Sequence, residues 1–189
     1  MKRVFALVLL TAICTAPASA SALSQFAAAW SNVNDYTCQI TTHETIGAAV
    51  QDRTYGYAFK KPHSAKSEIT VGPGKGAKLV WNGEGNRVMG LRGDTLESTS
   101  FAAILAWYQS GKGTLSETTT DTVLGVPIDT VTMLVANPSA NKDVSKDVLF
   151  ISRVNHLPVR RVRYEGNVLV KQEDFINLKT NTGLKDGDF

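Results

Sequence analysis

Few of the side chains that carry out catalysis or bind metals lie near one another in this sequence. The three histidines, His43, His63 and His156, are far apart. His43 and Glu44 begin like a zinc-binding helix motif, but no second histidine follows at the spacing that this motif requires. The sequence therefore predicts no metal site and no cofactor.

A cysteine nucleophile is also not favoured. Cys38 alternates with Tyr36 and Ile40, which predicts a core-facing position on a strand, where a thiol is unreactive. A pair of Cys38 with a histidine, or with a cysteine of another chain, is the weaker alternative. No Gly-x-Ser-x-Gly motif occurs, and the glycine-rich segment 72–78 lacks the spacing of a phosphate-binding loop. We therefore predict that the protein is not an enzyme.

Positive charge is densest at Arg160, Arg161 and Arg163. If this run lies on a strand, Arg161 and Arg163 point to one face and Arg160 to the other. The favoured interpretation is a solvated strand face. The alternative is that the three arginines contact anionic headgroups or an acidic partner. The net charge of the whole chain is only +3, which argues against nucleic acid as a partner.

The N-terminus has the three-part pattern of a cleavable signal peptide. Lys2 and Arg3 precede an apolar run, and small residues follow at positions 18–20. The run is shorter than the about 20 residues that a membrane-spanning helix needs. We expect residues 1–22 to be a signal peptide cleaved near Ala20 or Ala22. The mature protein would be periplasmic and without a transmembrane segment, and Cys38 would be its one cysteine.

The remaining residues, 23–189, predict a single domain of the α+β class. Apolar residues recur at helical spacing over 23–30 and from about Ser98 to Ser110. Alternating patterns between turn signals predict about nine or ten strands. So many strands with short links favour one large antiparallel sheet that curls strongly. The predicted strands are 36–41, 51–61, 64–71, 78–81, 87–91, 114–120, 128–135, 148–154, 159–165 and 168–178.

Several short segments resemble a known group of proteins. They are the sequences NHLPVRR (155–161), YEGN (164–167), FINLK (175–179) and NTGLKDGDF (181–189), with FKKP (59–62) and NG (82–83) in the first half. Together they resemble the LolA/LolB-like superfamily of periplasmic outer-membrane lipoprotein-sorting proteins. The resemblance implies a half-open β-barrel whose concave face is covered by helices, with an apolar cavity between them.

The resemblance also implies a function. Carriers of this superfamily hold the acyl chains of lipoproteins in the cavity, and a related branch senses envelope stress. We therefore expect a non-catalytic periplasmic carrier that binds a lipid or an acylated protein. The alternative is an envelope regulatory or sensory domain that binds a protein partner.

The cavity would be lined from two sides. On the central helix, one apolar stripe would face the sheet, and alternate residues of a later strand would form part of the opposite wall. The alternative is that these residues are ordinary core. The predicted ligand-binding residues are Phe101, Ile104, Leu105 and Tyr108 on the helix and Val131, Met133 and Val135 on the strand.

Overall fold

The computed structural model describes residues 20–85 and 87–189. Most of the predicted signal peptide, residues 1–19, lies outside the described residues. The described residues form two α-helices and nine strands, with two short 3-10 helices, η1 (Ser139–Asn141) and η2 (Asp186–Asp188). The α-helices are α1 (Ala22–Ser31) and α2 (Phe101–Tyr108). The strands are β1 (Asp35–Ile46), β2 (Ala49–Lys60), β3 (Ser64–Val71), β4 (Lys78–Trp81), β5 (Gly113–Val123), β6 (Val126–Val135), β7 (Lys146–Ser152), β8 (Pro158–Glu165) and β9 (Val168–Thr180).

All nine strands belong to one sheet, in the order β4-β3-β2-β1-β9-β8-β7-β6-β5, and every neighbouring pair is antiparallel. Most neighbouring strands of the sheet are also consecutive in the chain, as expected where short connections join antiparallel strands. The exception is the pairing of β1 with β9, which joins the two halves of the chain at the centre of the sheet. The predicted α+β class with an antiparallel sheet and two helices is confirmed.

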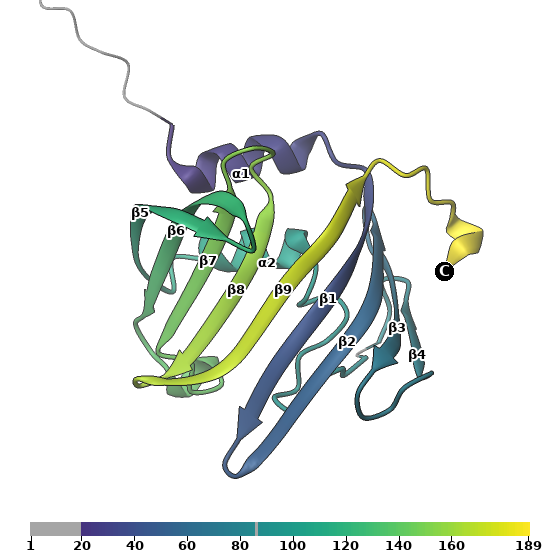
Figure 1. Ribbon diagram of the computed structural model, residues 1–189, viewed down its shortest axis with the longest axis horizontal. Helices are drawn as coiled ribbons and strands as arrows, with labels where there is room; N and C mark the ends of the chain where they lie inside the picture. Colours follow the sequence, from purple (N-terminus) through teal and green to yellow (C-terminus); the bar gives the residue numbers. More distant parts are fainter. Residues whose placement is uncertain (1–19, 86) are drawn as a thin grey trace, which may run out of the picture.

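Both helices pack on the same face of the sheet, which we call the inner face. Figure 1 shows α1 across one end of the strands and α2 behind the sheet. One hydrophobic cluster contains buried residues of both helices together with alternate residues of the strands. Phe26 of α1, Phe101 of α2 and Ile40 of β1 are all fully buried in it. The inner face of the sheet is therefore the core of the molecule.

The N-terminus of α1 is fixed to the edge strand β5. The Ser21 hydroxyl accepts a hydrogen bond from the Ser24 N–H at 3.2 Å, as an N-cap does. The Glu117 carboxylate of β5 accepts from the Ala22 N–H at 2.8 Å and from the Leu23 N–H at 3.2 Å. A carboxylate suits this position because the first N–H groups of a helix have no partner within the helix. These bonds place α1 over the end of the inner face.

One predicted strand, 87–91, is wrong. Its part of the chain makes a single bridge, between Val88 and Thr95. Instead of pairing with a strand, the segment packs against Glu44 of β1, whose carboxylate accepts a hydrogen bond from the Leu91 N–H at 2.9 Å. A side chain at Gly90 would not fit, because a Cβ there would lie 2.4 Å from the Glu44 carboxylate. Residues 87–100 therefore form a loop that crosses the inner face and leads into α2.

Candidate functional site

The centre of the candidate site is α2. Its N-cap is Ser100, whose hydroxyl accepts from the Ala103 N–H at 3.1 Å. The helix ends at Tyr108, and Gly111 follows with a φ of +69°, a conformation that glycine adopts without strain. The helix has only eight residues. A helix this short is stable because of its packing rather than its intrinsic propensity.

The structure brings the seven predicted ligand-binding residues into one hydrophobic cluster. The four on α2 face the sheet, and the three on β6 are buried in the same cluster. The most exposed of the seven, Leu105, has 9% of its surface accessible. Their contact with a ligand stays a prediction. The exposed fractions are 0% for Phe101, Ile104, Val131 and Met133, 1% for Tyr108, 7% for Val135 and 9% for Leu105.

Aromatic rings occupy much of the space beneath α2. The ring of Phe101 stacks on Tyr36 of β1, with centroids 4.4 Å apart, and meets the edge of Phe175 of β9 at 5.2 Å. The Tyr36 hydroxyl also accepts a hydrogen bond from the Phe101 N–H at 3.2 Å. Phe26 and Trp30 of α1 also make edge-to-face contacts with Phe101, with centroids 6.3 and 6.2 Å away. The inner face is therefore filled by side chains at this end of α2.

The arginine run lies on β8 and alternates as predicted. Arg160 is half-buried and pairs with Asp174 of β9 on the outer face. Arg161 and Arg163 point to the inner face, where each is only 7% exposed. The interpretation of the run as a solvated strand face is therefore wrong for these two arginines. They are buried because each has a buried carboxylate as a partner.

The first of these carboxylates is Asp147 of β7. It accepts hydrogen bonds from Arg161, the shortest of them 2.7 Å between Nη2 and Oδ2. The hydroxyl of Tyr108 on α2 donates to Asp147 Oδ1 at 2.8 Å. This hydrogen bond connects the end of α2 to the sheet. Asp147 is completely buried, so its carboxylate needs these hydrogen bonds to offset the cost of removing a charge from water.

The second carboxylate, Asp94, lies in the loop 87–100 and is at the centre of a larger ionic cluster. It accepts two hydrogen bonds from Arg163, at 2.9 and 2.7 Å, and one from Lys171 of β9 at 2.8 Å. Lys171 also lies 2.8 Å from a carboxylate oxygen of Glu44 and 3.0 Å from one of Glu173. Burial by itself would raise the pKa of Asp94, but the charges of Lys171 and Arg163 hold it well below the usual range.

Sequence reasoning missed these acidic residues and Lys171. The alternation of apolar residues that predicted the core also contained a signal for these buried charges. Glu44 continues the inward series of Tyr36, Cys38 and Ile40 on β1, and Asp147 is two residues before Leu149. A charged residue in register with a buried apolar series predicts a buried ion pair, but it does not identify the partner.

Grooves open on both faces of the sheet. A groove of about 550 Å³ lies over β1 to β4 beside the C-terminal segment, with Gly56 and Ala58 among its lining residues. A groove of about 330 Å³ lies along α2 on the inner side. Ala103 and Trp107 form part of its wall, and none of the seven predicted residues lines it. The predicted residues therefore pack in the core next to this groove.

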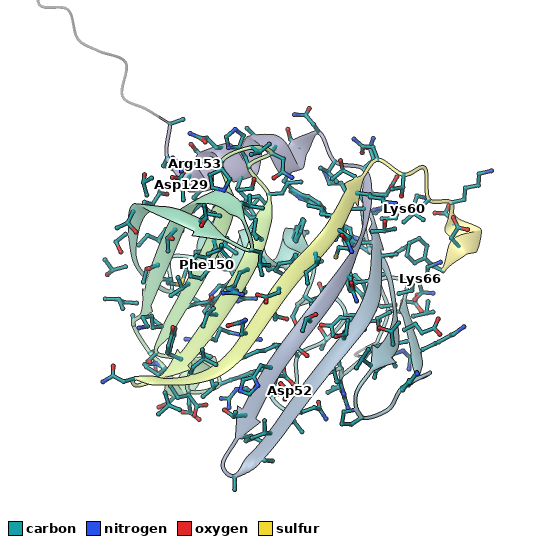
Figure 2. All side chains as sticks on the ribbon, viewed as in Figure 1. Asp52, Lys60, Lys66, Asp129, Phe150 and Arg153 are labelled. Carbon is teal, nitrogen blue, oxygen red and sulfur yellow. The ribbon has the colours of Figure 1, made fainter. Side chains whose placement is uncertain are left out.

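The C-terminal segment lies over the outer face near β2 and β3. Lys60 forms an ion pair with Asp186, and the Lys66 ammonium lies 5.3 Å from the ring centroid of Phe189. Figure 2 shows Lys60 and Lys66 beside this segment. The side chain of Asp35 accepts from the Thr182 N–H at 2.6 Å, which anchors the start of the segment.

The other candidate chemical groups are separate from one another. Cys38 is buried with a free thiol, and burial raises its pKa well above the usual value. His43 bonds to Asp52 at 2.7 Å on the surface. Among residues 20–85 and 87–189, no three His, Cys, Asp or Glu side chains are arranged to hold a metal ion. Within the same residues no helix has the length and apolar character to cross a membrane.

No protein-family model matches the sequence, and no curated protein does. Solved structures do match. MucB of Pseudomonas aeruginosa, in its complex with MucA, matches with 12% identity and a TM-score of 0.54, over 88% of this chain and 58% of MucB. A lipoprotein-sorting protein domain of the outer membrane from Vibrio parahaemolyticus matches with 10% identity and a TM-score of 0.45, over 88% of this chain and 94% of that one. A LolA superfamily protein from Nitrosomonas europaea matches with 12% identity and a TM-score of 0.42, over 90% and 98%.

The match to MucB shows that this chain and MucB share a fold. Membership of the superfamily that the sequence segments resemble stays a prediction. At such low identity a structural match shows a common fold and nothing more. The similarity to MucB is the strongest of the three by TM-score, and this chain spans only 58% of MucB.

Proposed function

We propose that this chain, which has a LolA-like fold, is an exported binding protein without catalytic activity. It holds an acyl chain of a lipid or lipoprotein between α2 and the inner face of the sheet. The observation that carries the proposal is the packing of α2. Its buried stripe of Phe101, Ile104, Leu105 and Tyr108 lies against apolar residues of the sheet, and loops flank the helix at residues 87–100 and 109–112.

The energies make an exchange between helix and ligand feasible. Each of the four buried side chains of α2 contributes about 1.5 to 3 kcal/mol by its burial, so exposing all of them would cost on the order of 10 kcal/mol. Transfer of a dozen methylene groups from water gains about 0.8 kcal/mol each, a similar total. An acyl chain that slides beneath α2 while remaining in contact with it could therefore replace the sheet as the surface on which the helix packs.

The proposed site lies in a half-open barrel. The sheet ends at the edge strands β4 and β5, and α1 and α2 cover the inner face between them. Displacement of α2 would leave an apolar concave surface that includes Val131 and Met133 of β6. Export through the predicted signal peptide would place the protein in the periplasm, where acylated proteins and lipids require carriers.

The test compares two lysine substitutions on the same helix. Leu105 faces the core, whereas its neighbour Ala106 is exposed. Wild type, Leu105→Lys and Ala106→Lys are incubated with a palmitoylated peptide and examined by native mass spectrometry without detergent. We expect wild type and Ala106→Lys to bind one acyl chain, and Leu105→Lys to bind at least tenfold less.

Circular dichroism and a melting curve show whether Leu105→Lys is folded. If it is not, Leu105→Gln replaces it, because a neutral amide is less costly to bury than an ammonium group. Wild-type protein that stays free of ligand at saturating peptide concentration would contradict the proposal. Equal binding by wild type and a folded Leu105 variant would also contradict it.

A second candidate function is binding of a regulatory protein partner. Two observations favour it: the inner face beneath α2 is filled by aromatic rings, and the fold is similar to that of MucB, whose structure was determined with MucA. In this case the acyl-binding test would be negative, and binding would depend on residues of the outer face such as the half-buried Arg160.

A further inference from the structure

We propose that the groove along α2 binds the phosphate group of an anionic ligand, with Lys112 and Lys142 as its main contacts. The proposal rests on the proposed function in one respect: the acyl part of the same ligand would lie beneath α2. The groove has a volume of about 330 Å³ and lies between α2, β7, β8 and the loop that contains Lys142. This volume is sufficient for a phosphate ester with part of its glycerol.

Positively charged residues outnumber negatively charged ones in the lining of the groove. Its lining contains two lysines and two arginines, but only two carboxylates. Both carboxylates are already engaged, because Asp147 accepts hydrogen bonds from Arg161, and Asp94 accepts them from Arg163. The buried arginines are therefore neutralised. Among the residues that line the groove, an excess of two positive charges remains, and Lys112 and Lys142 carry it.

Both lysines are available to a ligand. They are exposed, and neither forms an ion pair with a carboxylate among the residues that the structure describes. The Lys112 ammonium lies 5.2 Å from the ring centroid of Trp107, and Lys142 donates to the Gly93 carbonyl at 3.0 Å. A phosphate bound between them would therefore displace no ion pair in this part of the chain.

Two buried donors at the groove add to this argument. Trp107 Nε1 and Arg163 Nε are buried and have no hydrogen-bond acceptor among the described residues, and both residues line the groove. Buried donors without an acceptor are rare in folded proteins and require an explanation. A phosphate oxygen, or a water that it fixes, would supply an acceptor after a small movement of the Trp107 ring.

The remaining lining explains why the ligand should be a phosphate ester attached to an apolar group. Ala103, Val144 and the ring of Trp107 form an apolar wall beside the charges. Tyr108 follows Trp107 on the same helix and points into the core, so the groove and the proposed acyl site lie on adjacent sides of α2. One amphiphilic ligand could occupy both.

The experiment follows the indole N–H signals of the tryptophans by NMR while four probes are added. The probes are inorganic phosphate, glycerol 3-phosphate, dihexanoyl phosphatidylglycerol and the uncharged lipid dihexanoylglycerol, all below their aggregation concentrations. We expect the signal of Trp107 to shift with the three phosphate probes, most strongly with the phospholipid. The signal of Trp81, which is buried on β4, should not move.

Two double variants test the lysines. Lys112→Gln with Lys142→Gln removes the proposed contacts, and Lys75→Gln with Lys179→Gln removes two exposed charges elsewhere. Two unit charges 4 Å apart in water interact strongly enough to change a Kd about fivefold. We therefore expect the first pair to weaken phospholipid binding roughly 10- to 30-fold and the second pair to change it less than twofold.

The outcomes separate this proposal from the proposed function. Equal affinity for the charged and uncharged lipids, or equal loss in both double variants, would overturn the phosphate site and leave acyl binding intact. A shift with glycerol 3-phosphate that needs Lys112 and Lys142, without any acyl binding, would support the phosphate site and overturn the carrier function. A response to inorganic phosphate alone, at the same affinity in both double variants, would indicate nonspecific ion binding and overturn the site.

Discussion

Replacement of Asp94 by asparagine should test whether the ionic cluster holds the loop 87–100 on the sheet. The change keeps the shape of the side chain but removes its charge. Asp94 accepts three hydrogen bonds, two from Arg163 and one from Lys171, and is 5% exposed. Both oxygens of Asp94 accept hydrogen bonds, whereas an asparagine accepts only at its one amide oxygen. Its amide nitrogen is a donor and would face the donor groups of Arg163 or Lys171.

The cost follows from the hydrogen bonds and ion pairs that the substitution removes. Each hydrogen bond to a charged group contributes about 1.5 to 3 kcal/mol, and breaking a buried ion pair costs about 3 to 5 kcal/mol. Glu44 and Glu173 remain near Lys171, which offsets part of this cost. We expect a destabilisation of about 3 kcal/mol. For a chain of this size that corresponds to a melting temperature lower by about 6 to 12 °C.

Glu173→Gln is the matched control. Glu173 is as deeply buried as Asp94 and belongs to the same cluster, but its contacts are weaker: its Oε1 lies 3.0 Å from the Lys171 ammonium without a hydrogen bond, and its Oε2 lies 3.7 Å from Arg163. Its replacement should cost about 1 kcal/mol. Urea unfolding gives both free energies, and hydrogen exchange of residues 96–108 reports on the attachment of α2. Equal destabilisation by the two variants would refute the role assigned to Asp94.

The pH dependence provides a second check on Asp94. Its pKa in the folded protein lies well below that in the unfolded chain, which is about 3.9. The unfolded chain therefore binds more protons in acid, and the stability from Asp94 is present above about pH 4 and lost as the pH falls further. The difference in unfolding free energy between wild type and Asp94→Asn should be constant from about pH 7 to 5 and shrink towards about pH 2.5. A difference that grows in acid would contradict the assignment.

Three further changes test other parts of the structure. Tyr108→Phe removes the hydrogen bond to Asp147 and should cost about 1 kcal/mol in urea unfolding, because Asp147 keeps its arginine; a neutral result would show that the bond does not hold α2. The thiol of Cys38 should react with iodoacetamide at about pH 8 only after unfolding, since burial raises its pKa and blocks access; rapid labelling of folded protein would contradict its core position. Lys60→Gln should change the unfolding free energy by less than about 1 kcal/mol, yet increase proteolysis near Asp186; unchanged cleavage would show that the ion pair does not hold the C-terminal segment.

Much of the fold could be predicted from local patterns. The helix 23–30 and the strand 64–71 correspond closely to α1 and β3, and the final strand of the structure begins at Val168 as expected. These elements were predictable because the period of the apolar residues differs between helix and strand. The segment 87–91 was not, because its hydrogen bonds go to Glu44 and Asp94 rather than to a neighbouring strand.

The candidate site, like the fold, was predictable only in part. Periodicity predicted that Phe101, Leu105 and Tyr108 share one face of a helix, and the structure shows that this face is buried. The alternation of Arg160 with Arg161 was also predictable. The burial of Arg161 was not, because it depends on Asp147, which is 14 residues away in the sequence and lies on the neighbouring strand.

The sequence by itself determined the α+β class, the direction in which each side chain of a strand points, and the apolar face of α2. These properties depend on residues a few positions apart, which the chain order displays directly. Only the tertiary structure decided which charges neutralise one another and which, such as Lys112 and Lys142, stay available. Electrostatic energy depends on distances between residues that are far apart in the sequence, so it is defined only once the sheet has brought β1, β7, β8 and β9 together beneath the loop of Asp94.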